Sequence, residues 1–369
     1  IFFQMLASRF MEVYGLDEHI ASIRISDPIP AAAAALEKLK SISDVTLCVY
    51  HGGFERDLAT GRVLSATHEN VAYRICQELD FDILLTGHQH MSVPGQTLFG
   101  TFVVQPSDRG QEFIRVEAVL SGEEKRITSE TVPAHGACRR EWLEEFSEME
   151  HGAQNWLDEV IGTLPHALPL LPDTPLRMAA EGSGLPDLFN AVQLWASGAQ
   201  LSATSLANDV AGLPKTVRRR DLLIAYPYTN TLAVLEITGK VLKAALERSA
   251  EYFSRGEDGR LCVSDVFLRP KVEHYNYDYY AGVSYVYDIS RPVGERVTSM
   301  RVNGQDVREE DTFTICLNSY RASGTGGYDF YVGCPVVREI GTEMADLILD
   351  CFKEFKGNIP AMQSDFRVI

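Results

Sequence analysis

The hydrophobic positions in the first third of the chain alternate between a helical period and short, continuous apolar runs. Residues 28–40 (PIPAAAAALEKLK) consist of strong helix formers, with Pro30 at the opening and a basic end, which predicts a helix. The runs 45–54 (VTLCVYHGGF) and 80–90 (DFDILLTGHQH) are short enough to be strands buried on both faces, and a helical segment at 69–79 separates them. Helix, strand, helix, strand is the order of an α/β layered fold.

The later pattern predicts further strands and a second domain. Runs 97–106 and 112–120 are expected to form a β-hairpin at a sheet edge. After Ile127, residues 138–162 are acidic with scattered aromatic residues, which indicates a linker helix, and the Pro-rich stretch 169–175 marks a loop. We therefore expect a first domain over 1–127, a linker region over 128–168 and a second domain over 169–369. The hydrophobic periodicity of the second domain predicts helices over 185–197, 240–253 and 343–355. It predicts strands over 222–228, 231–237, 283–290, 297–302 and 312–317.

Composition narrows the classes of function. The 369 residues suit two domains, and 34 Lys plus Arg against 51 Asp plus Glu give a net charge of -17. Such an acidic chain repels a phosphate polymer, so we expect no nucleic-acid polymer as a partner. No run approaches the roughly 18 apolar residues of a membrane helix, so no membrane span is expected. The 7 cysteines include no CxxC pair, which argues against a disulfide framework and a thiolate zinc site.

Three histidines follow the two predicted buried strands. His51 ends the first strand, and His88 and His90 lie in the Gly-His-Gln-His turn after the second. Loops at the carboxyl ends of neighbouring strands meet at one crevice, where three imidazoles could bind a transition metal. The alternative is a polar turn with no ligand. The other histidines lack such a setting and are interpreted as ordinary surface or structural residues: His19, His68, His135, His151, His166 and His274.

Several motifs together resemble a known enzyme family. CVYHGGFERDLATG, ILLTGHQHMS and VVQPSDRGQ are similar to segments of the calcineurin-like metallophosphoesterase domain. LSATSLANDVAG, the segment from 218 to 253 and LNSYRASGTGGYDF resemble the C-terminal domain of 5'-nucleotidases. In this order the motifs resemble the bacterial 2',3'-cyclic-nucleotide 2'-phosphodiesterase/3'-nucleotidase family from about Ser26 onward. The fold implied is α/β: the C-terminal half of a metallophosphoesterase α/β/β/α sandwich, followed by a mixed α/β nucleotidase domain.

The resemblance implies a site with two divalent metal ions. By motif, His51 and His88 would bind one ion and His90 the other. Mn, Zn, Mg or Fe all suit a set of nitrogen and oxygen ligands. Two such ions clamp phosphoryl oxygens and lower the pKa of a bound water molecule.

The N-terminal motifs of that family are missing from the sequence. Its DxH, GD and GNH motifs supply a bridging carboxylate, an Asn ligand and the catalytic histidine, and no GNH occurs here. The spacing Asp17-Glu18-His19 precedes the wrong element and is interpreted as chance. We therefore expect a fragment whose catalytic residues are unknown, whose own activity is near background, and which would pair with the missing N-terminal segment.

Two tyrosine-bearing motifs in the second half are candidates for binding the nucleotide base. By resemblance, Tyr275 and Tyr320 would stack on its two faces. Arg321 could bind a phosphate or ribose oxygen, with a surface ion pair as the alternative. Asn318 and Gly324 belong to the same motif, whose Gly-rich run lets the backbone pass close to a ligand. Asn208, Arg220 and Asn230 lie in similar segments, without an assigned role.

The expected function is therefore metal-dependent hydrolysis of nucleotide phosphoesters, with a nucleotide or nucleoside as the partner. The YRASGTGG text favours 2',3'-cyclic nucleotides and 3'-nucleotides. The alternatives are a 5'-nucleotidase and a truncated, non-catalytic nucleotide-binding module. By analogy with the family, we expect a location outside the cytoplasm, in the periplasm or at the cell wall.

Overall fold

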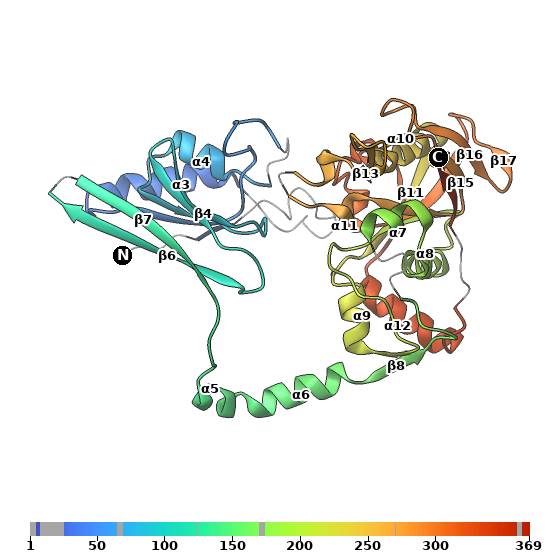
Figure 1. The fold of residues 1–369 in the computed structure, drawn as a ribbon, viewed down its shortest axis with the longest axis horizontal. Helices are drawn as coiled ribbons and strands as arrows, with labels where there is room; N and C mark the ends of the chain where they lie inside the picture. Colours follow the sequence, from blue (N-terminus) through green and yellow to red (C-terminus); the bar gives the residue numbers. More distant parts are fainter. Residues whose placement is uncertain are drawn as a thin grey trace. The chain divides into compact units, whose positions relative to one another are not determined.

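A computed structural model describes residues 5–7, 26–64, 69–122, 124–169, 174–269, 271–359 and 364–369. The chain divides into two compact units, Ile1–Arg140 and Glu141–Ile369, and each is described by itself (Figure 1). The first unit extends past Ile127 because a strand that begins at Glu124 continues to Pro133. The segment Asp17–His19 and the histidine His68 lie outside the described residues.

The first unit is built on a mainly parallel sheet of five strands in the order β1-β2-β3-β5-β4. Neighbours among β1, β2, β3 and β5 pair in parallel, and β4 is antiparallel to β5. The two connecting helices are those that the sequence predicts. The bounds are β1 (Met5–Ala7), α3 (Pro28–Lys40), β2 (Leu47–His51), α4 (Ala72–Glu78), β3 (Ile83–Leu85), β4 (Val93–Leu98) and β5 (Thr101–Gln105).

The predicted hairpin between runs 97–106 and 112–120 is wrong. The first run is itself folded back, because Phe99 and Gly100 adopt left-handed φ values of 52° and 97° between β4 and β5. The second run forms β6 (Glu112–Ser121), which pairs with β7 (Glu124–Pro133) in a separate two-stranded sheet. A local turn therefore competes successfully with pairing between the two runs.

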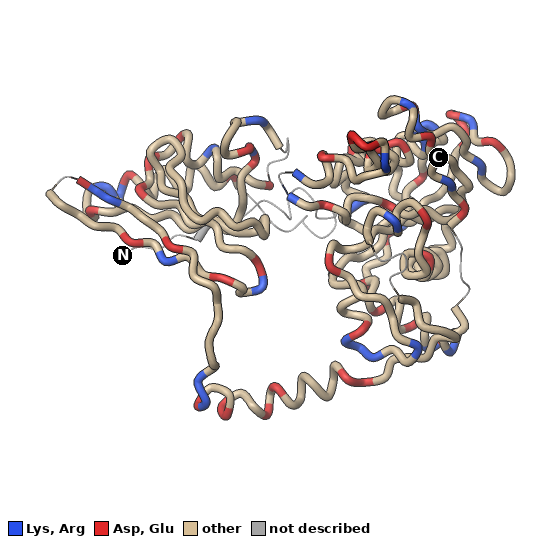
Figure 2. The backbone as a smooth tube through the Cα atoms, in the orientation of Figure 1, with Lys and Arg blue, Asp and Glu red and all other residues tan. Residues whose placement is uncertain are grey.

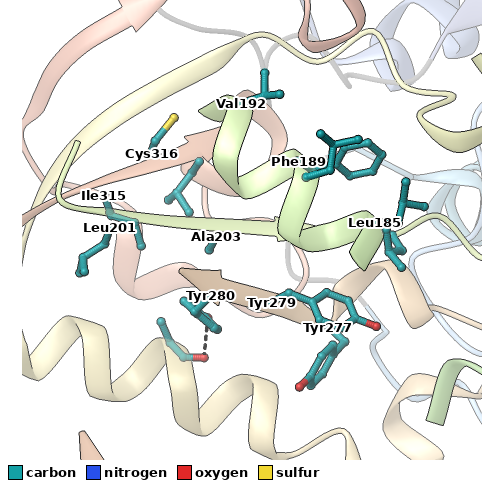
Figure 3. Close-up of a cluster of buried hydrophobic side chains, with 14 of the residues drawn as sticks. Leu185, Phe189, Val192, Leu201, Ala203, Tyr277, Tyr279, Tyr280, Ile315 and Cys316 are labelled. Atoms are coloured by element: carbon teal, nitrogen blue, oxygen red, sulfur yellow. Dashed lines mark hydrogen bonds between the residues drawn. The ribbon is translucent and has the colours of Figure 1, made fainter. Parts of the chain in front are cut away.

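The second unit has a central sheet in the order β14-β9-β18-β11-β19. Helices α8 and α10 lie on opposite sides of β9, and the hydroxyl of Tyr280 donates to the carbonyl of Ala245 on α10 (Figure 3). The predicted helices and most predicted strands are confirmed. The sheet and its helices have these bounds: α8 (Gly184–Ser197), β9 (Leu201–Ser205), β11 (Leu232–Thr238), α10 (Gly239–Ala250), β14 (Asp278–Ala281), β18 (Thr312–Asn318), β19 (Val336–Ile340) and α12 (Met344–Phe355).

Smaller elements complete this unit. The expected linker helix is two helices, α5 and α6. The bounds are α5 (Arg140–Glu145), α6 (Ser147–Leu157), β8 (Val160–Thr163), α7 (Pro175–Glu181), β10 (Thr216–Arg218), α9 (Arg219–Ala225), β12 (Phe253–Arg255), β13 (Leu261–Val263), η1 (Asp265–Phe267), η2 (His274–Asn276), β15 (Ser284–Tyr287), β16 (Val297–Val302), β17 (Gln305–Asp306), α11 (Ser319–Ala322), η3 (Asp329–Tyr331) and β20 (Asp365–Val368).

The strand predicted over 222–228 is wrong, because most of that run belongs to helix α9. Asp221 accepts a hydrogen bond from the backbone N–H of Arg218 at 2.7 Å, which supports the first turn. Leu222 and Ala225, three residues apart, are buried, whereas Ile224 is exposed. The helical period is therefore present in the run, but it is masked by consecutive apolar residues.

Charge is distributed over the whole chain. Figure 2 shows Asp and Glu spread over both units, with Lys and Arg interspersed among them. Among the described residues, no helix is both long and apolar enough to cross a bilayer.

Candidate functional site

The first candidate site lies at the carboxyl edge of the parallel sheet. β2 ends at His51, and its neighbour β3 ends at Leu85, directly before the loop that carries His88 and His90. Parallel pairing places both strand ends at one edge. The rings of His51 and His88 meet there in an edge-on arrangement, with centroids 5.6 Å apart and planes inclined by 66°.

The loop that follows His51 and the loop that carries His88 and His90 are the two histidine loops. Backbone and amide hydrogen bonds join them. Gly87 donates from its N–H to the carbonyl of Gly52 at 3.2 Å. The side chain of Gln89 bonds to both polar groups of the Phe54 backbone: Oε1 accepts from N–H at 2.7 Å, and Nε2 donates to the carbonyl at 3.0 Å. Asn70 accepts from the N–H of Gly53 at 2.6 Å. The position of His88 relative to His51 is therefore set by contacts between the loops.

The backbone of the Gly-His-Gln-His turn has an unusual conformation at both histidines. His88 has a φ of 71° and His90 a φ of 55°, which is the left-handed region. Residues other than glycine adopt this region rarely, and such strain gathers at functional sites. The carboxylate of Glu69 lies 2.6 Å from Nε2 of His88, and both side chains are mostly buried.

His90 has different surroundings. Its side chain is 64% exposed, and its Nδ1 lies 4.0 Å from the carboxylate of Asp108, which follows β5. The structure thus brings His51 and His88 together and places His90 on the same turn. Imidazole nitrogens with neighbouring carboxylates suit a divalent ion. Within the described part of the chain, however, no three His, Cys, Asp or Glu side chains gather closely enough to hold one, so these residues fit part of a metal site.

The second candidate site lies at one edge of the central sheet in the second unit. β9 and β18 are parallel, and both end at this edge, while the antiparallel strands β11 and β14 begin there. Four loops therefore meet at this edge. They carry Asn208 and Tyr228, and they include the short helical turns η2 and α11, which carry Tyr275 and Tyr320.

Tyr275 and Tyr320 are both half-buried. Burial raises the pKa of the Tyr275 phenol, and the nearby Glu273 and Tyr320 raise it further. The hydroxyl of Tyr275 donates to Glu273 at 3.1 Å, and the ammonium of Lys271 lies 5.3 Å from its ring centroid. Burial also raises the pKa of Tyr228 to about 12.

Arg321 lies in a different environment from the one expected. It is 2% exposed, and its guanidinium forms an ion pair with Asp278, with Nε 2.9 Å from Oδ2. Nη1 donates to the carbonyl of Thr325 at 2.6 Å, and Nη2 donates to the carbonyl of Tyr275 at 3.0 Å. Arg321 therefore forms a buried ion pair. It was expected to contact a phosphate or ribose oxygen, with a surface ion pair as the alternative, and the buried network is neither of these.

Asn318 and Gly324 also face the protein. Oδ1 of Asn318 accepts from the N–H of Arg321 at 2.7 Å and caps α11. Gly324 has a φ of 89°, and a Cβ there would lie 2.6 Å from the side chain of Val332. Both residues therefore shape the loop that carries Tyr320.

Asn208, Arg220 and Asn230 each contact another part of the protein. Asn208 donates to the carbonyl of Val272 at 2.8 Å, which joins two of the four loops. The carbonyl of Asn230 accepts from the N–H of Met344 at 2.9 Å. Arg220 forms an ion pair with Asp158 at 2.8 Å, next to helix α6.

Sequence reasoning missed the polar residues that hold these loops: Glu69, Asn70, Gln89 and Asp278. Gln89 lies within the Gly-His-Gln-His turn and the other three lie close to a motif, so position in or beside a motif is the one available signal in the sequence. Their partners are 17 to 43 residues away, which no local pattern reveals.

Comparisons with known proteins agree with this organisation. A model of the 5'-nucleotidase C-terminal domain matches residues 160–333. A trifunctional nucleotide phosphoesterase of Bacillus subtilis is 22% identical over 94% of the chain, and a 2',3'-cyclic-nucleotide 2'-phosphodiesterase/3'-nucleotidase of Yersinia enterocolitica is 23% identical over 79%. The chain spans 27% and 53% of the lengths of these curated relatives.

A solved structure gives a stronger match. A Staphylococcus aureus protein assigned as a 5'-nucleotidase, crystallised with alpha-ketoglutarate, superposes with a TM-score of 0.89 at 34% identity. The match covers 99% of this chain and 72% of that one. It includes both units, so the resemblance extends beyond the C-terminal domain. The chain belongs to the 5'-nucleotidase family.

Proposed function

We propose that this protein is a metal-dependent hydrolase of the 2',3'-cyclic-nucleotide 2'-phosphodiesterase and 3'-nucleotidase type. The observation that carries the proposal is the meeting of His51 and His88 at the carboxyl edge of a parallel sheet, with centroids 5.6 Å apart. Family membership and the names of the curated relatives support a nucleotide phosphoester as the substrate. A location outside the cytoplasm is part of this proposal and rests on the family resemblance alone.

In the proposed first site, His51 and His88 hold one divalent ion, and His90 holds a second. When bound, such ions make a hydroxide available at neutral pH and neutralise phosphoryl oxygens. Glu69 accepts a hydrogen bond from Nε2–H of His88, which fixes the ring in the tautomer whose lone pair is on Nδ1. Gln89 and Asn70 keep the two histidine loops in register, so the imidazoles do not need to be ordered by the ion.

In the proposed second site, Tyr275 and Tyr320 stack on the two faces of the nucleobase. Stacking on an aromatic side chain contributes roughly 1–3 kcal/mol per base and accepts any base. Both rings are half-buried and come from loops at the same sheet edge, which supports this assignment. The hydrogen bond from Tyr275 to Glu273 keeps that ring in one orientation.

We further propose that the 369 residues by themselves release phosphate at close to the background rate. The support is the family resemblance, because the GNH motif that supplies the catalytic histidine does not occur in the sequence. The test measures phosphate release from 2',3'-cyclic AMP with added Mn²⁺, and compares this chain with one extended by the family's DxH, GD and GNH motifs. Equal turnover by the two chains would contradict the assignment of the metal ligands.

The extended chain also tests the substrate. Faster hydrolysis of 2',3'-cyclic AMP and 3'-AMP than of 5'-AMP is expected from the YRASGTGG loop and the names of the relatives. A clear preference for 5'-AMP would replace this proposal with a 5'-nucleotidase. No turnover of any of the three nucleotides, with metal present, would remove the enzymatic proposal.

A further inference from the structure

One buried arginine connects the loops that carry both candidate base-stacking residues. Arg321 follows Tyr320 in the chain, and its Nη2 donates to the carbonyl of Tyr275 at 3.0 Å. The same guanidinium contacts the carbonyl of Thr325 at 2.6 Å and the side-chain oxygen of Asn276 at 3.5 Å. A single side chain therefore touches both the segment that carries Tyr275 and the Gly-rich loop that follows Tyr320.

The guanidinium is anchored to the central sheet. Its carboxylate partner, Asp278, is 1% exposed, lies on β14 and pairs with Ser205 of β9. Two guanidinium nitrogens contact this carboxylate at 2.9 Å, which is the forked geometry that arginine forms and lysine cannot reproduce. The guanidinium also lies over the ring of Tyr328, 4.1 Å from its centroid. The position of Arg321 is therefore set by the sheet rather than by the loops.

A charge buried in this way has few alternative arrangements. Burial alone would lower the pKa of Arg321, but the attraction of Asp278 reverses that direction. Each guanidinium nitrogen has an acceptor in the protein. Loss of one acceptor would leave a buried donor unpaired, so the loop carbonyls are held at fixed distances from the sheet.

We propose that Arg321 is a positioning residue that presets the gap between Tyr275 and Tyr320 to the width of a nucleobase. The inference rests on the proposed base-binding function of these two tyrosines. Arg321 acts on one tyrosine through its main-chain carbonyl and on the other as its neighbour in the chain, and it does not touch the base. The expected ligand class is any purine or pyrimidine nucleoside, because the device sets a spacing and reads no base edge.

A matched pair of glycine variants tests this idea without removing a charge. Gly326 and Gly333 both have left-handed backbones, with φ values of 78° and 84°, so alanine strains the backbone at either position. A Cβ on Gly326 would overlap Arg321 and Asn276, whereas a Cβ on Gly333 would meet nothing within 4 Å. Gly326→Ala is expected to weaken adenosine binding at least tenfold, and Gly333→Ala less than twofold, as measured by calorimetry on the 369-residue chain.

A second pair uses arginines. Arg296 is also buried, and it holds the carbonyls of Ala250 and Phe253 at 2.9 Å and 2.7 Å. Arg321→Lys is expected to weaken adenosine binding at least tenfold, whereas Arg296→Lys leaves it unchanged. Thermal unfolding of each variant sets a measurement temperature at which all of them are folded. If Arg321→Lys does not fold, the glycine pair decides.

A spectroscopic signature separates positioning from general destabilisation. Adenosine stacked on tyrosine changes the near-ultraviolet circular dichroism of the tyrosine band. This change should persist in Gly333→Ala and Arg296→Lys and disappear in Gly326→Ala. Adenosine affinity in folded Gly326→Ala and Arg321→Lys equal to that of the unmodified chain would overturn the inference and leave the base site standing. Absence of adenosine binding by the unmodified chain would overturn the base site and the inference together.

Discussion

Gly53 and Gln89 are packed so closely that a Cβ on Gly53 would overlap the side-chain amide of Gln89. That amide is the group that bonds to both backbone polar groups of Phe54. Gly53 is therefore needed because the absence of a Cβ leaves room for the side-chain amide of Gln89. The contact between the two histidine loops depends on this space.

Substitution of Gly53 should separate the two loops. Gly53→Ala forces the amide of Gln89 away from Phe54, and we expect a lower melting temperature and weaker Mn²⁺ binding, measured by calorimetry. Overpacking of this kind destabilises a protein by roughly 1–3 kcal/mol. Gly136→Ala is the matched control, because a Cβ at Gly136 meets nothing within 4 Å. Equal effects of the two variants would mean that the amide contact is not needed.

Removal of the amide itself should have a related effect. Gln89→Ala leaves the N–H and carbonyl of Phe54 without this partner, and a buried unpaired polar group costs roughly 1–3 kcal/mol. We expect reduced stability of the first unit in urea titration and a weaker Mn²⁺ affinity. Gln89→Glu keeps the acceptor for the Phe54 N–H and loses the donor to its carbonyl. The stability and Mn²⁺ affinity of Gln89→Glu should therefore lie between those of the unmodified chain and those of Gln89→Ala. Full stability of Gln89→Ala would contradict the assigned role.

The carboxylate beside His88 should affect metal affinity. Glu69→Gln preserves the shape but weakens the interaction with Nε2 at 2.6 Å. Loss of such a partner to a ligating histidine reduces metal affinity by about 10- to 100-fold. We expect this range for Mn²⁺ binding by calorimetry, with Glu150→Gln on the exposed face of α6 as the control. Unchanged affinity in Glu69→Gln would show that His88 is not a metal ligand.

Stacking predicts a graded effect at Tyr320. Tyr320→Ala should weaken adenosine binding by roughly 1–3 kcal/mol, whereas Tyr320→Phe keeps the aromatic face and should retain most of the affinity. Calorimetric titration of the 369-residue chain with adenosine measures both. Equal affinity in all three proteins would place the base elsewhere.

The half-buried histidine next to Tyr275 predicts a dependence of stability on pH. Burial lowers the pKa of His274 from its ordinary value of 6.5, and its Nδ1 lies 2.7 Å from the hydroxyl of Tyr252. Below pH 6.5 the unfolded chain binds a proton that the folded chain resists, so the stability of the second unit falls as pH decreases. His274→Asn can still accept from Tyr252 and does not titrate. Its melting temperature should decline less between pH 7 and pH 5 than that of the unmodified chain, and equal declines would refute this origin.

Some elements could be predicted from sequence because their determinants are local. Helix α3 has the bounds Pro28–Lys40 that its proline, its alanine run and its basic end predict. The shared position of His51 and His88 could be predicted because the carboxyl ends of neighbouring parallel strands lie at one edge of a sheet. In contrast, most of the run 222–228 is helical where the sequence predicts a strand, since the unbroken apolar residues from Leu222 to Tyr226 obscure the spacing of Leu222 and Ala225.

The polar contacts that organise both sites could not be predicted in this way. Arg321 pairs with Asp278 across 43 residues, and Gln89 reaches Phe54 across 35. These pairings depend on how the loops meet after the sheets have formed. Arg321 was expected to face a ligand because its motif borders the proposed base site. Its burial follows from a carboxylate on β14 that no local pattern connects to it.

The left-handed turn at His88 and His90 constrains how this sequence could diverge. A descendant that no longer needed the imidazoles would still need residues that tolerate positive φ, which are glycine, asparagine and aspartate. β-Branched residues would be excluded at both positions whatever their chemistry. Loss of activity in a lineage would therefore leave a recognisable trace, in which the histidines of this turn drift toward Gly, Asn or Asp while the surrounding loop keeps its shape.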